Sequence, residues 1–389
     1  MHPGRFIFSQ LMDFVPKYEF DKCVRRYGGN RRVRTFSCYD QFLCMAFGQL
    51  TYRESLRDVV TCLEVLKPKL FHVGIRGKLS RSTLADANEN RDWRIYAEFA
   101  QVLIAEARTL YADEDFGVEL DNTVYALDSS TIDLCLSLFP WAKFRKAKGA
   151  IKLHTQIDLH GPIPVFMRIT DGSVHDVHFL DQIIFEARSI NVFDRGYLDF
   201  KRLFRIEKAN AYFVIRSKKN TCFYVRKSRP VDKSTGLRCD QVIHLSSAKG
   251  KRDYPQGLRR ISFIDTATGK RLVFLTNNFD LLAITIAIIY KNRWQIELFF
   301  KWIKQNLRIK AFYGTSENAV RTQIWIAICV YLKVACLNKV HGINESLSRI
   351  LQILSVNVFQ KVPFNQLLAY YDTRNSENDI SKQLVFNGF

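Results

Sequence analysis

Hydrophobic residues recur every three to four positions through much of the first third of the chain. This helix-like spacing is found in residues 40–50, 53–66 and 93–111. Each such segment presents one apolar face, which a globular protein buries against neighbouring helices. Between the last two segments, Ser80 or Ser82 is placed to cap a further short helix. The pattern predicts an all-helical N-terminal domain over residues 1–115.

From Leu120 onward, the pattern changes to the short apolar and alternating runs of β-strands. Strands are predicted in TVYALDSSTIDL, KLHTQIDLHG, PIPVFMRITDG and the start of NVFDRGYLDF, with a helix over HDVHFLDQIIFEARSI. The first strand is predicted to end near Asp128 and the last at Asp194. This order is the opening order of the ribonuclease H-like fold, in which acidic residues on adjacent central strands meet at one sheet edge. We therefore assign residues 116–207 to the first part of an α/β core.

Residues 208–280 have a different sequence pattern, in which further predicted strands are separated by turn residues. These strands are AYFVIRSKK, TCFYVRKSR, QVIHLSS, RRISFIDTATG and KRLVFLTNN. They predict a mainly β insertion within the core. Because the strands are rich in Lys and Arg, one face is expected to lie along a phosphate backbone, and a solvated basic face is the alternative. Helical spacing then returns, and we assign residues 281–345 to the rest of the core and residues 346–389 to a helical C-terminal region.

The segment YKNRWQIELFFKWIKQNL, residues 290–307, predicts one helix with an unusual polar stripe. At about 100° per residue, Tyr290, Arg293, Glu297 and Lys304 share a stripe about 60° wide. Aromatic and aliphatic residues cover much of the remaining surface, and a helix that is apolar on most sides is buried. The stripe is therefore expected to lie in a crevice.

The charge balance points to a polyanionic partner. The 389 residues include 58 Lys and Arg but only 38 Asp and Glu, which gives a net charge of +20. Nucleic acid is the commonest partner of such a chain, and a merely basic soluble protein is the alternative. In this basic setting, the short N-terminal helices resemble a helix-turn-helix reader, although a plain helical bundle fits them as well.

The cysteines and the apolar runs indicate the cellular compartment of the protein. Nine cysteines without a CxxC pair predict buried free thiols in a reducing compartment, with neither a disulfide framework nor a zinc site. The N-terminus lacks the apolar stretch of a signal peptide. The longest apolar runs, residues 281–290 and 324–332, are too short to span a bilayer. A cytoplasmic location is expected.

Three carboxylates are candidates for chemistry: Asp128 and Asp194 at predicted strand ends, and Glu297 on the predicted buried helix. A carboxylate in an apolar setting is costly unless it is paired or binds a metal. Three that converge could hold two Mg²⁺ ions, which would stabilise the attacking and leaving oxygens of a phosphoryl transfer. The structural alternatives are a turn cap for Asp128, an ion pair of Asp194 with Arg195, and a bridge from Glu297 to Arg293 and Lys301 at helical spacing.

The spacing Tyr290-x-x-Arg293-x-x-x-Glu297-x-x-x-x-x-x-Lys304 resembles the Y-R-E-K signature of the insertion-sequence-four family of bacterial DDE transposases. Two further blocks, ALDSSTIDLCLSLFPWAKFRKAKGAIKLH and NVFDRGYLDF, resemble that family's segments around its first two catalytic aspartates. The stretch FSQLMDFVPKYEFDKCVRRYGGNRRVRTFSCYDQF is similar to the helical domain ahead of many such cores. The resemblance covers nearly the whole chain and is thinnest after about Asn344.

The resemblance implies roles for individual residues. Asp128, Asp194 and Glu297 would be the catalytic, metal-binding triad, with two Mg²⁺ ions that Mn²⁺ can replace. The residues expected to contact DNA are Tyr290, Arg293, Lys304, Trp294, Lys148 and Lys152. Trp294 or Trp302 could stack on an unstacked base, although core packing is preferred for Trp302.

The segment GSVHD, with His175 and Asp176, is also shared with the family. We interpret it mainly as a helix start, with a role at the catalytic edge as the alternative. For Lys148 and Lys152, solvated side chains are an equally acceptable interpretation.

The implied activity is cut-and-paste transposition: cleavage at the element's end, a hairpin intermediate, and strand transfer to target DNA. The helical N-terminal domain would bind the terminal inverted repeats of double-stranded DNA, with a homodimer forming on it in the bacterial nucleoid. The alternatives are a related nuclease that does not join strands and an inactive DNA-binding regulator.

Overall fold

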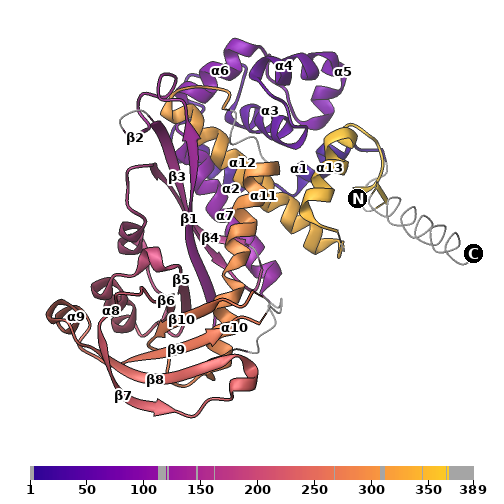
Figure 1. Ribbon diagram of the computed structural model, residues 1–389. Coiled ribbons are helices and arrows are strands. Elements are labelled where there is room, and N and C mark those ends of the chain that lie inside the picture. Colours follow the sequence, from indigo (N-terminus) through magenta and orange to yellow (C-terminus); the bar gives the residue numbers. More distant parts are fainter. Residues whose placement is uncertain are drawn as a thin grey trace, which may run out of the picture. The chain divides into compact units, whose positions relative to one another are not determined.

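The computed structural model describes residues 4–112, 120, 122–145, 148–161, 163–266, 268–306, 312–343, 345–364 and 366–367. The chain divides into two compact units, one of Met1–Leu110 with Trp302–Phe389 and one of Tyr111–Lys301. The first unit is helical and the second is built on a large sheet (Figure 1). The prediction of a mixed α/β protein with an all-helical N-terminal region is confirmed at this level.

The helical unit contains the predicted N-terminal helices. Its helices are α1 (Ile7–Asp13), α2 (Lys17–Arg26), α3 (Cys38–Leu50), α4 (Leu56–Val65), α5 (Lys67–Leu70), α6 (Arg81–Asn90), α7 (Arg94–Tyr111), α12 (Glu317–Val340) and α13 (Leu347–Asn357). Ser80 caps α6 as predicted, because its hydroxyl accepts the backbone N–H of Thr83 at 3.1 Å. Ser37 caps α3 in the same way, and Asp40 completes a capping box.

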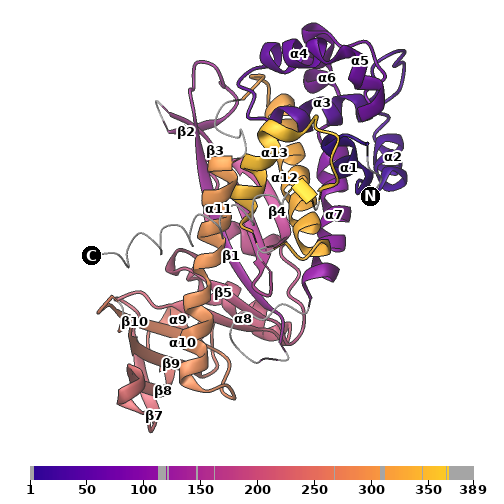
Figure 2. The ribbon, with the colours of Figure 1, turned by 90° about the vertical axis from the view of Figure 1, so that its right-hand side faces the viewer.

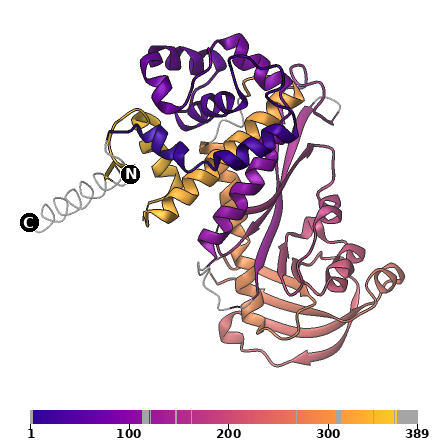
Figure 3. The same ribbon diagram turned by 180° about the vertical axis from the view of Figure 1, so that it is seen from behind.

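The long helix α12 is the centre of this unit and packs against α1, α3, α6 and α13 (Figure 3). By length and composition alone it is long and apolar enough to cross a membrane, although the prediction that the uninterrupted apolar runs are too short to do so holds for residues 324–332 within it. That prediction counted only the uninterrupted apolar run and not the helix around it. In the described structure, 94% of the most apolar stretch of α12 is buried, which is the environment of a core helix.

The second unit is organised by one sheet. Its strands are β1 (Val124–Leu134), β2 (Lys143–Arg145), β3 (Lys148–Asp158), β4 (Ile163–Asp171), β5 (Ile190–Phe193), β6 (Tyr212–Arg216), β7 (Phe223–Arg229), β8 (Leu237–Leu245), β9 (Leu258–Ile264) and β10 (Arg271–Thr276). They are ordered β2-β3-β1-β5-β6-β10-β9-β8-β7, with β4 paired to β3. The pairs β1–β5 and β5–β6 are parallel, and the other pairs are antiparallel.

Two predicted boundaries in this unit were wrong. Strand β1 does not end near Asp128 but continues to Leu134, because β3 pairs with it along that length. The helix expected over HDVHFLDQIIFEARSI is only a 3-10 helix, η2 (Asp176–Gln182). Ile183 is already extended, and Arg188 is left-handed with φ 66°, so the segment leaves the helical conformation before it enters β5.

The predicted β insertion consists of β7–β10 and the short helix α9 (Ala248–Asp253), and it extends the same sheet. Strand β6, which lies in the region predicted as the insertion, pairs in parallel with β5 and stands near the middle of the sheet. A buried ion pair holds the insertion together: Arg259 donates from Nε and Nη2 to the two oxygens of Asp240 at 2.9 and 2.7 Å. Its Nη1 also donates to the Leu281 carbonyl at 2.6 Å, which ties β9 to the start of the next helix.

The helix predicted over residues 290–307 is two helices, α10 (Ala283–Asn292) and α11 (Trp294–Asn306). Helix α10 packs against β6, β8 and β9, and α11 continues from it (Figure 2). At the junction, the Arg293 N–H bonds to the Tyr290 carbonyl, and the Ile296 N–H bonds to the Arg293 carbonyl. These i to i+3 bonds tighten the chain locally, so the prediction of one uninterrupted helix was wrong at Arg293.

The nine cysteines are free thiols, as predicted, but they are not all buried. Cys135 and Cys222 are exposed. Cys135 directly follows strand β1, and Cys222 directly precedes strand β7, so both lie at strand ends.

Candidate active site

Asp128 and Asp194 stand next to each other at the same edge of two parallel strands. Leu127 of β1 is in register with Phe193 of β5. Each aspartate is the next residue along its strand direction, so the parallel pairing brings two carboxylates together from distant parts of the sequence. Asp194 begins the 3-10 turn η3 (Arg195–Tyr197) without capping it, and its carboxylate is not used to hold that turn.

The Asp128 carboxylate is in an environment that opposes its charge. Burial raises its pKa to about 6, and the nearby carboxylates of Asp194 and Glu297 add to the rise. The Ser129 N–H, which donates at 2.8 Å, and the Arg293 guanidinium act in the opposite direction and lower the pKa. The three acids therefore interact electrostatically, and a cation placed among them would relieve the repulsion.

Arg293 lies between two of these acids. Its Nη1 donates to Oδ2 of Asp128 at 3.2 Å, and its Nη2 donates to Oε1 of Glu297 at 2.5 Å. The Glu297 side chain is 58% exposed, whereas that of Asp128 is 23% exposed. The expectation that Glu297 is buried was therefore wrong, because it lies on the open side of α11.

Tyr290 supports the Arg293 side chain. The tyrosine is only 7% exposed, and its ring packs on Phe274 with centroids 4.6 Å apart. The Arg293 guanidinium lies 5.8 Å from the Tyr290 ring centroid, within the range of a cation–π contact. Burial raises the pKa of the Tyr290 hydroxyl, so it stays protonated and can act as a hydrogen-bond donor.

The segment GSVHD lies beside the first aspartate. Asp176 accepts a hydrogen bond from the Ser129 hydroxyl at 2.8 Å, and Ser129 directly follows Asp128. The Lys152 ammonium lies 3.1 Å from Asp176 and also donates to the Val174 carbonyl at 2.8 Å. Lys152 is thus engaged in holding this segment, while Lys148 is exposed.

A buried histidine, His154, packs next to the GSVHD segment and was not predicted from the sequence. The His154 ring stacks on Phe179 with centroids 4.8 Å apart, and its Nε2 lies 2.9 Å from the Thr170 hydroxyl. Burial lowers the pKa of His154 to about 4, so the ring is neutral at pH 7. The position of His154 within a strand gave no signal of this role.

The two tryptophans occupy different environments. Trp294 is 50% exposed at the start of α11. Trp302 belongs to the helical unit, where its ring packs on Tyr331 with centroids 4.5 Å apart. Core packing, the preferred interpretation of Trp302, therefore agrees with the structure. Lys304 is on the part of α11 that also belongs to the helical unit.

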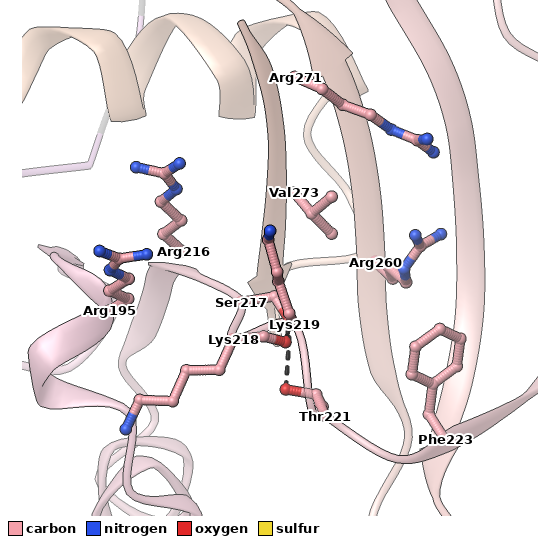
Figure 4. Close-up of a pocket in the computed structure, with 10 residues that line it drawn as sticks. All are labelled: Arg195, Arg216, Ser217, Lys218, Lys219, Thr221, Phe223, Arg260, Arg271 and Val273. Atoms are coloured by element: carbon pink, nitrogen blue, oxygen red, sulfur yellow. Dashed lines mark hydrogen bonds between the residues drawn. The ribbon is translucent and has the colours of Figure 1, made fainter.

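A basic pocket of about 390 Å³ begins where β6 ends (Figure 4). Six of its ten lining residues are cationic, and none is acidic. The cations are Arg195, Arg216, Lys218, Lys219, Arg260 and Arg271. Arg195 directly follows Asp194, and Arg216 follows Ile215, which is in register with Phe193. The pocket therefore adjoins the edge that holds the two aspartates.

This pocket was not predicted from the sequence, although a basic insertion was. The available signal was the run RSKK directly after the strand AYFVI, because cations at that position share an edge with Asp194. Arg260 lies over the Phe223 ring at 5.1 Å from its centroid, so the far wall combines a guanidinium with an aromatic face.

The carboxylates match the chemistry of a hard divalent cation, which prefers oxygen ligands. Within the described residues, no group of three or more His, Cys, Asp or Glu side chains is already arranged around a metal position. Arg293 instead supplies the positive charge between Asp128 and Glu297. The donor set fits a metal, provided that the Arg293 side chain moves from its present position.

Comparison with known proteins gives an independent view of the same residues. A family model described as a transposase DDE domain matches residues 119–333. A second model, described as a domain of unknown function, matches residues 4–76.

Curated relatives agree with the first match. A protein assigned as a transposase in Sinorhizobium fredii is 32% identical over 282 residues, which are 72% of this chain and 77% of that protein. One assigned to an insertion sequence of Geobacillus stearothermophilus is 31% identical over 208 residues, or 53% of this chain and 54% of that protein. A Synechocystis protein assigned to an insertion sequence is 28% identical over 67% of this chain and 72% of its own length.

Among solved structures, the piggyBac transposase in a synaptic complex with hairpin DNA aligns with 92% of this chain and 78% of its own. The TM-score is 0.45 and the sequence identity is 10%.

Proposed function

We propose, since this chain belongs to the DDE transposase family and is the DNA transposase of an insertion sequence, that Asp128, Asp194 and Glu297 are its catalytic carboxylates. The enzyme cleaves and joins DNA, and the family depends on a divalent metal. The observation that carries the proposal is the register of Leu127 with Phe193, which puts Asp128 beside Asp194, while Arg293 links Asp128 to Glu297.

The central strands support a ribonuclease H-like core. Three antiparallel strands, β4, β3 and β1, are followed in the sheet by the parallel strands β5 and β6. We propose that this five-strand order is the catalytic core, and that β7–β10 are the insertion that separates Glu297 from the two aspartates in sequence.

Two Mg²⁺ ions, or Mn²⁺ in their place, would be held by the three carboxylates and would stabilise charge on the attacking and leaving oxygens. The chain's own contribution is positioning. Arg293 would turn from the carboxylates to a phosphate of the bound strand, and its planar fork suits two phosphate oxygens. The Tyr290 ring, which lies 5.8 Å from the Arg293 guanidinium, would remain beside the arginine as a cation–π partner.

The reaction follows from in-line phosphoryl transfer at one site. Water attacks the phosphodiester at the element's end and displaces the 3′-oxygen, which leaves as a hydroxyl. That 3′-hydroxyl then attacks the opposite strand to form a hairpin, water reopens the hairpin, and the same hydroxyl attacks target DNA. Each step breaks one P–O bond and forms another.

The DNA would lie across the exposed cations beside the site. Trp294 is proposed to stack on an unstacked base, which its half-exposed ring supports, whereas the ring of Trp302 packs on Tyr331. We propose that the basic pocket holds backbone phosphates of the strand next to the cut, with exposed Lys148 as a further contact. Lys304 is proposed as a phosphate contact on α11.

The helical unit is proposed to bind the terminal inverted repeats. Holding both ends of an element for a single reaction requires two copies of the chain, so a homodimer assembled on DNA is expected. The enzyme would act in the bacterial cytoplasm, on the nucleoid.

The catalytic proposal is tested with a duplex that carries the terminal repeat, incubated with Mg²⁺. Alanine at Asp128, Asp194 or Glu297 is expected to lower strand cleavage roughly a hundredfold or more while leaving end binding intact. Asp133→Ala is the matched control, because Asp133 is an exposed acid on the same strand as Asp128. Full cleavage by any one triad variant would remove that residue from the site.

Adding target DNA to the same reaction follows strand joining as well as cleavage. Joined products are expected from the wild type, and cleavage without any joining would contradict the cut-and-paste reaction.

The pocket is tested by the salt dependence of end binding. Lys218→Ala with Lys219→Ala is expected to reduce the slope of log K against log salt by about 0.9 for each phosphate that the variant no longer neutralises. The control is Lys249→Ala with Lys251→Ala, which removes equal charge from the exposed helix α9. Equal slopes for the two variants would contradict a phosphate site in the pocket.

A further inference from the structure

The connection between α2 and α3 carries a concentration of arginines. Residues 28–36, here called the arginine turn, have the sequence GGNRRVRTF. Arg31, Arg32 and Arg34 are all exposed, and no carboxylate partner of theirs is found among the residues that the structure describes. Arg26, just before the turn, contrasts with them because it forms an ion pair with Glu98. The turn therefore presents three guanidinium groups to solvent.

The base of the turn is held firmly. Oδ1 of Asn30 accepts the Cys38 N–H at 2.8 Å, and the Gly29 N–H donates to the Val24 carbonyl at 2.9 Å. Arg91 donates to the carbonyls of Phe36 and Ser37 and so fixes the other end. Such anchoring reduces the entropy cost when the turn engages a partner.

Close packing at Gly29 adds to this rigidity. A Cβ added to Gly29 would lie 2.5 Å from Cδ1 of Ile95 and 2.6 Å from Sγ of Cys38, so the backbone is pressed onto the helices beneath it. At the opposite side of the turn, Arg32 adopts a left-handed conformation with φ 59°. A non-glycine residue in that region is unfavourable and is kept only where the surroundings impose it.

The cations of the turn are arginine rather than lysine throughout. The guanidinium group is more weakly hydrated than an ammonium and enters narrow spaces at a lower desolvation cost. Arginine is the side chain that proteins insert into a narrow minor groove, where the negative potential of duplex DNA is strongest.

A hollow of about 500 Å³ lies beside the turn. It is lined by Arg31 and Arg34 of the turn, by α6, by Arg91 and by the carboxylates of Asp86 and Asp92. The two acids repel a phosphate backbone, so the favourable contacts are the exposed guanidinium groups of the turn.

We infer that the arginine turn enters the minor groove of duplex DNA at the ends of the element. This assigns a DNA contact to the segment whose family match carries no function. The inference rests on the proposed function only in that the duplex is the element's own terminal repeat. The proposed contact joins the duplex to the helical unit. The inference therefore does not depend on the roles proposed for the catalytic carboxylates.

The test uses the full-length protein in EDTA, so that binding is measured without cleavage. The probes are a duplex with the terminal repeat and a scrambled duplex of equal length. Arg31→Ala, Arg32→Ala and Arg34→Ala are combined in one variant, which is expected to bind the repeat about 30-fold or more weakly. The matched control combines Arg57→Ala, Lys67→Ala and Lys78→Ala, three exposed cations of the same unit, and is expected to bind like the wild type.

A second variant keeps the charge and guards against a folding artefact. Arg31→Lys, Arg32→Lys and Arg34→Lys are expected to remain well below wild-type affinity, and a minor-groove drug such as distamycin is expected to displace the wild type. Wild-type affinity in the alanine variant would overturn the inference. Full rescue by lysine, or indifference to distamycin, would reduce the contact to phosphate attraction and overturn the groove assignment.

Failure of the proposed function looks different. In that case, the wild type itself would not distinguish the terminal repeat from the scrambled duplex, whatever the variants did.

Discussion

Nη1 of Arg293 lies 3.2 Å from Oδ2 of Asp128, although 165 residues separate the two along the chain. The same guanidinium also reaches Glu297 on its own helix. One cation thus neutralises two proposed metal ligands and occupies the space between them. This contact links the strand that bears Asp128 to the junction of α10 and α11.

Two substitutions of Arg293 distinguish the contribution of its positive charge from that of its planar guanidinium group. Arg293→Ala is expected to lower the rate of strand cleavage at pH 7.5 by roughly a hundredfold, because it removes the guanidinium proposed to turn to a phosphate of the bound strand. Arg293→Lys keeps the charge without the planar fork and is expected to recover only part of the rate. Single-turnover cleavage of a labelled duplex measures both, and a fully active lysine variant would show that the fork is not required.

The raised pKa of Asp128 predicts how the stability of the metal-free protein depends on pH. The unfolded carboxyl titrates near 3.8 and the folded one near 6, so the folded state binds more protons between these values. The stabilising contribution is complete below pH 3.8 and is lost as the pH rises through 6. Asp128→Asn removes this titration and is expected to be more stable than the wild type by about 3 kcal/mol at pH 7.5.

The measurement is urea denaturation of both proteins in EDTA. The advantage of the asparagine variant is expected to vanish near pH 4. A difference that stays constant across this range would mean that Asp128 does not titrate with a raised pKa.

The two tryptophans of α11 are expected to respond in opposite ways to truncation. Trp294→Ala removes a half-exposed ring and should change the free energy of unfolding by less than about 1 kcal/mol while weakening cleavage. Trp302→Ala removes a ring packed on Tyr331 and should destabilise the protein by about 3 kcal/mol. Denaturation and cleavage assays on both variants check this. Loss of stability in Trp294→Ala alone would reverse the assignment.

The ion pair between Arg259 and Asp240 is expected to be needed for the insertion to fold. The two side chains are only 2% and 6% exposed, so removing one partner leaves the other buried and unpaired. Asp240→Ala is expected to cost about 3–5 kcal/mol of unfolding free energy. Glu19→Ala, which breaks the exposed pair with Lys22, is the control and should cost less than about 0.5 kcal/mol. Similar costs for the two variants would contradict the burial argument.

Some features of the fold were predictable from local pattern. Helices α3, α4 and α7 and most strands begin and end within a few residues of the predicted positions, because the repeat of apolar residues fixes which face of an element is buried. The length of β1 was not predictable, because its second half is extended only through pairing with β3. The early end of the helix at Gln182 has a similar cause, since the chain must become extended before it enters β5 beside β1.

The sequence by itself determined most of the helical and β segments, the three candidate acids, the Y-R-E-K spacing around Glu297, and membership of the transposase family. Only the tertiary structure decided that Leu127 and Phe193, the residues before Asp128 and Asp194, pair in register, that Arg293 bridges Asp128 to Glu297, and that a basic pocket adjoins them. The spacing of apolar residues shows on which face of its own helix or strand each residue lies. Distances between residues far apart in the chain depend on strand register and packing, which local pattern does not encode.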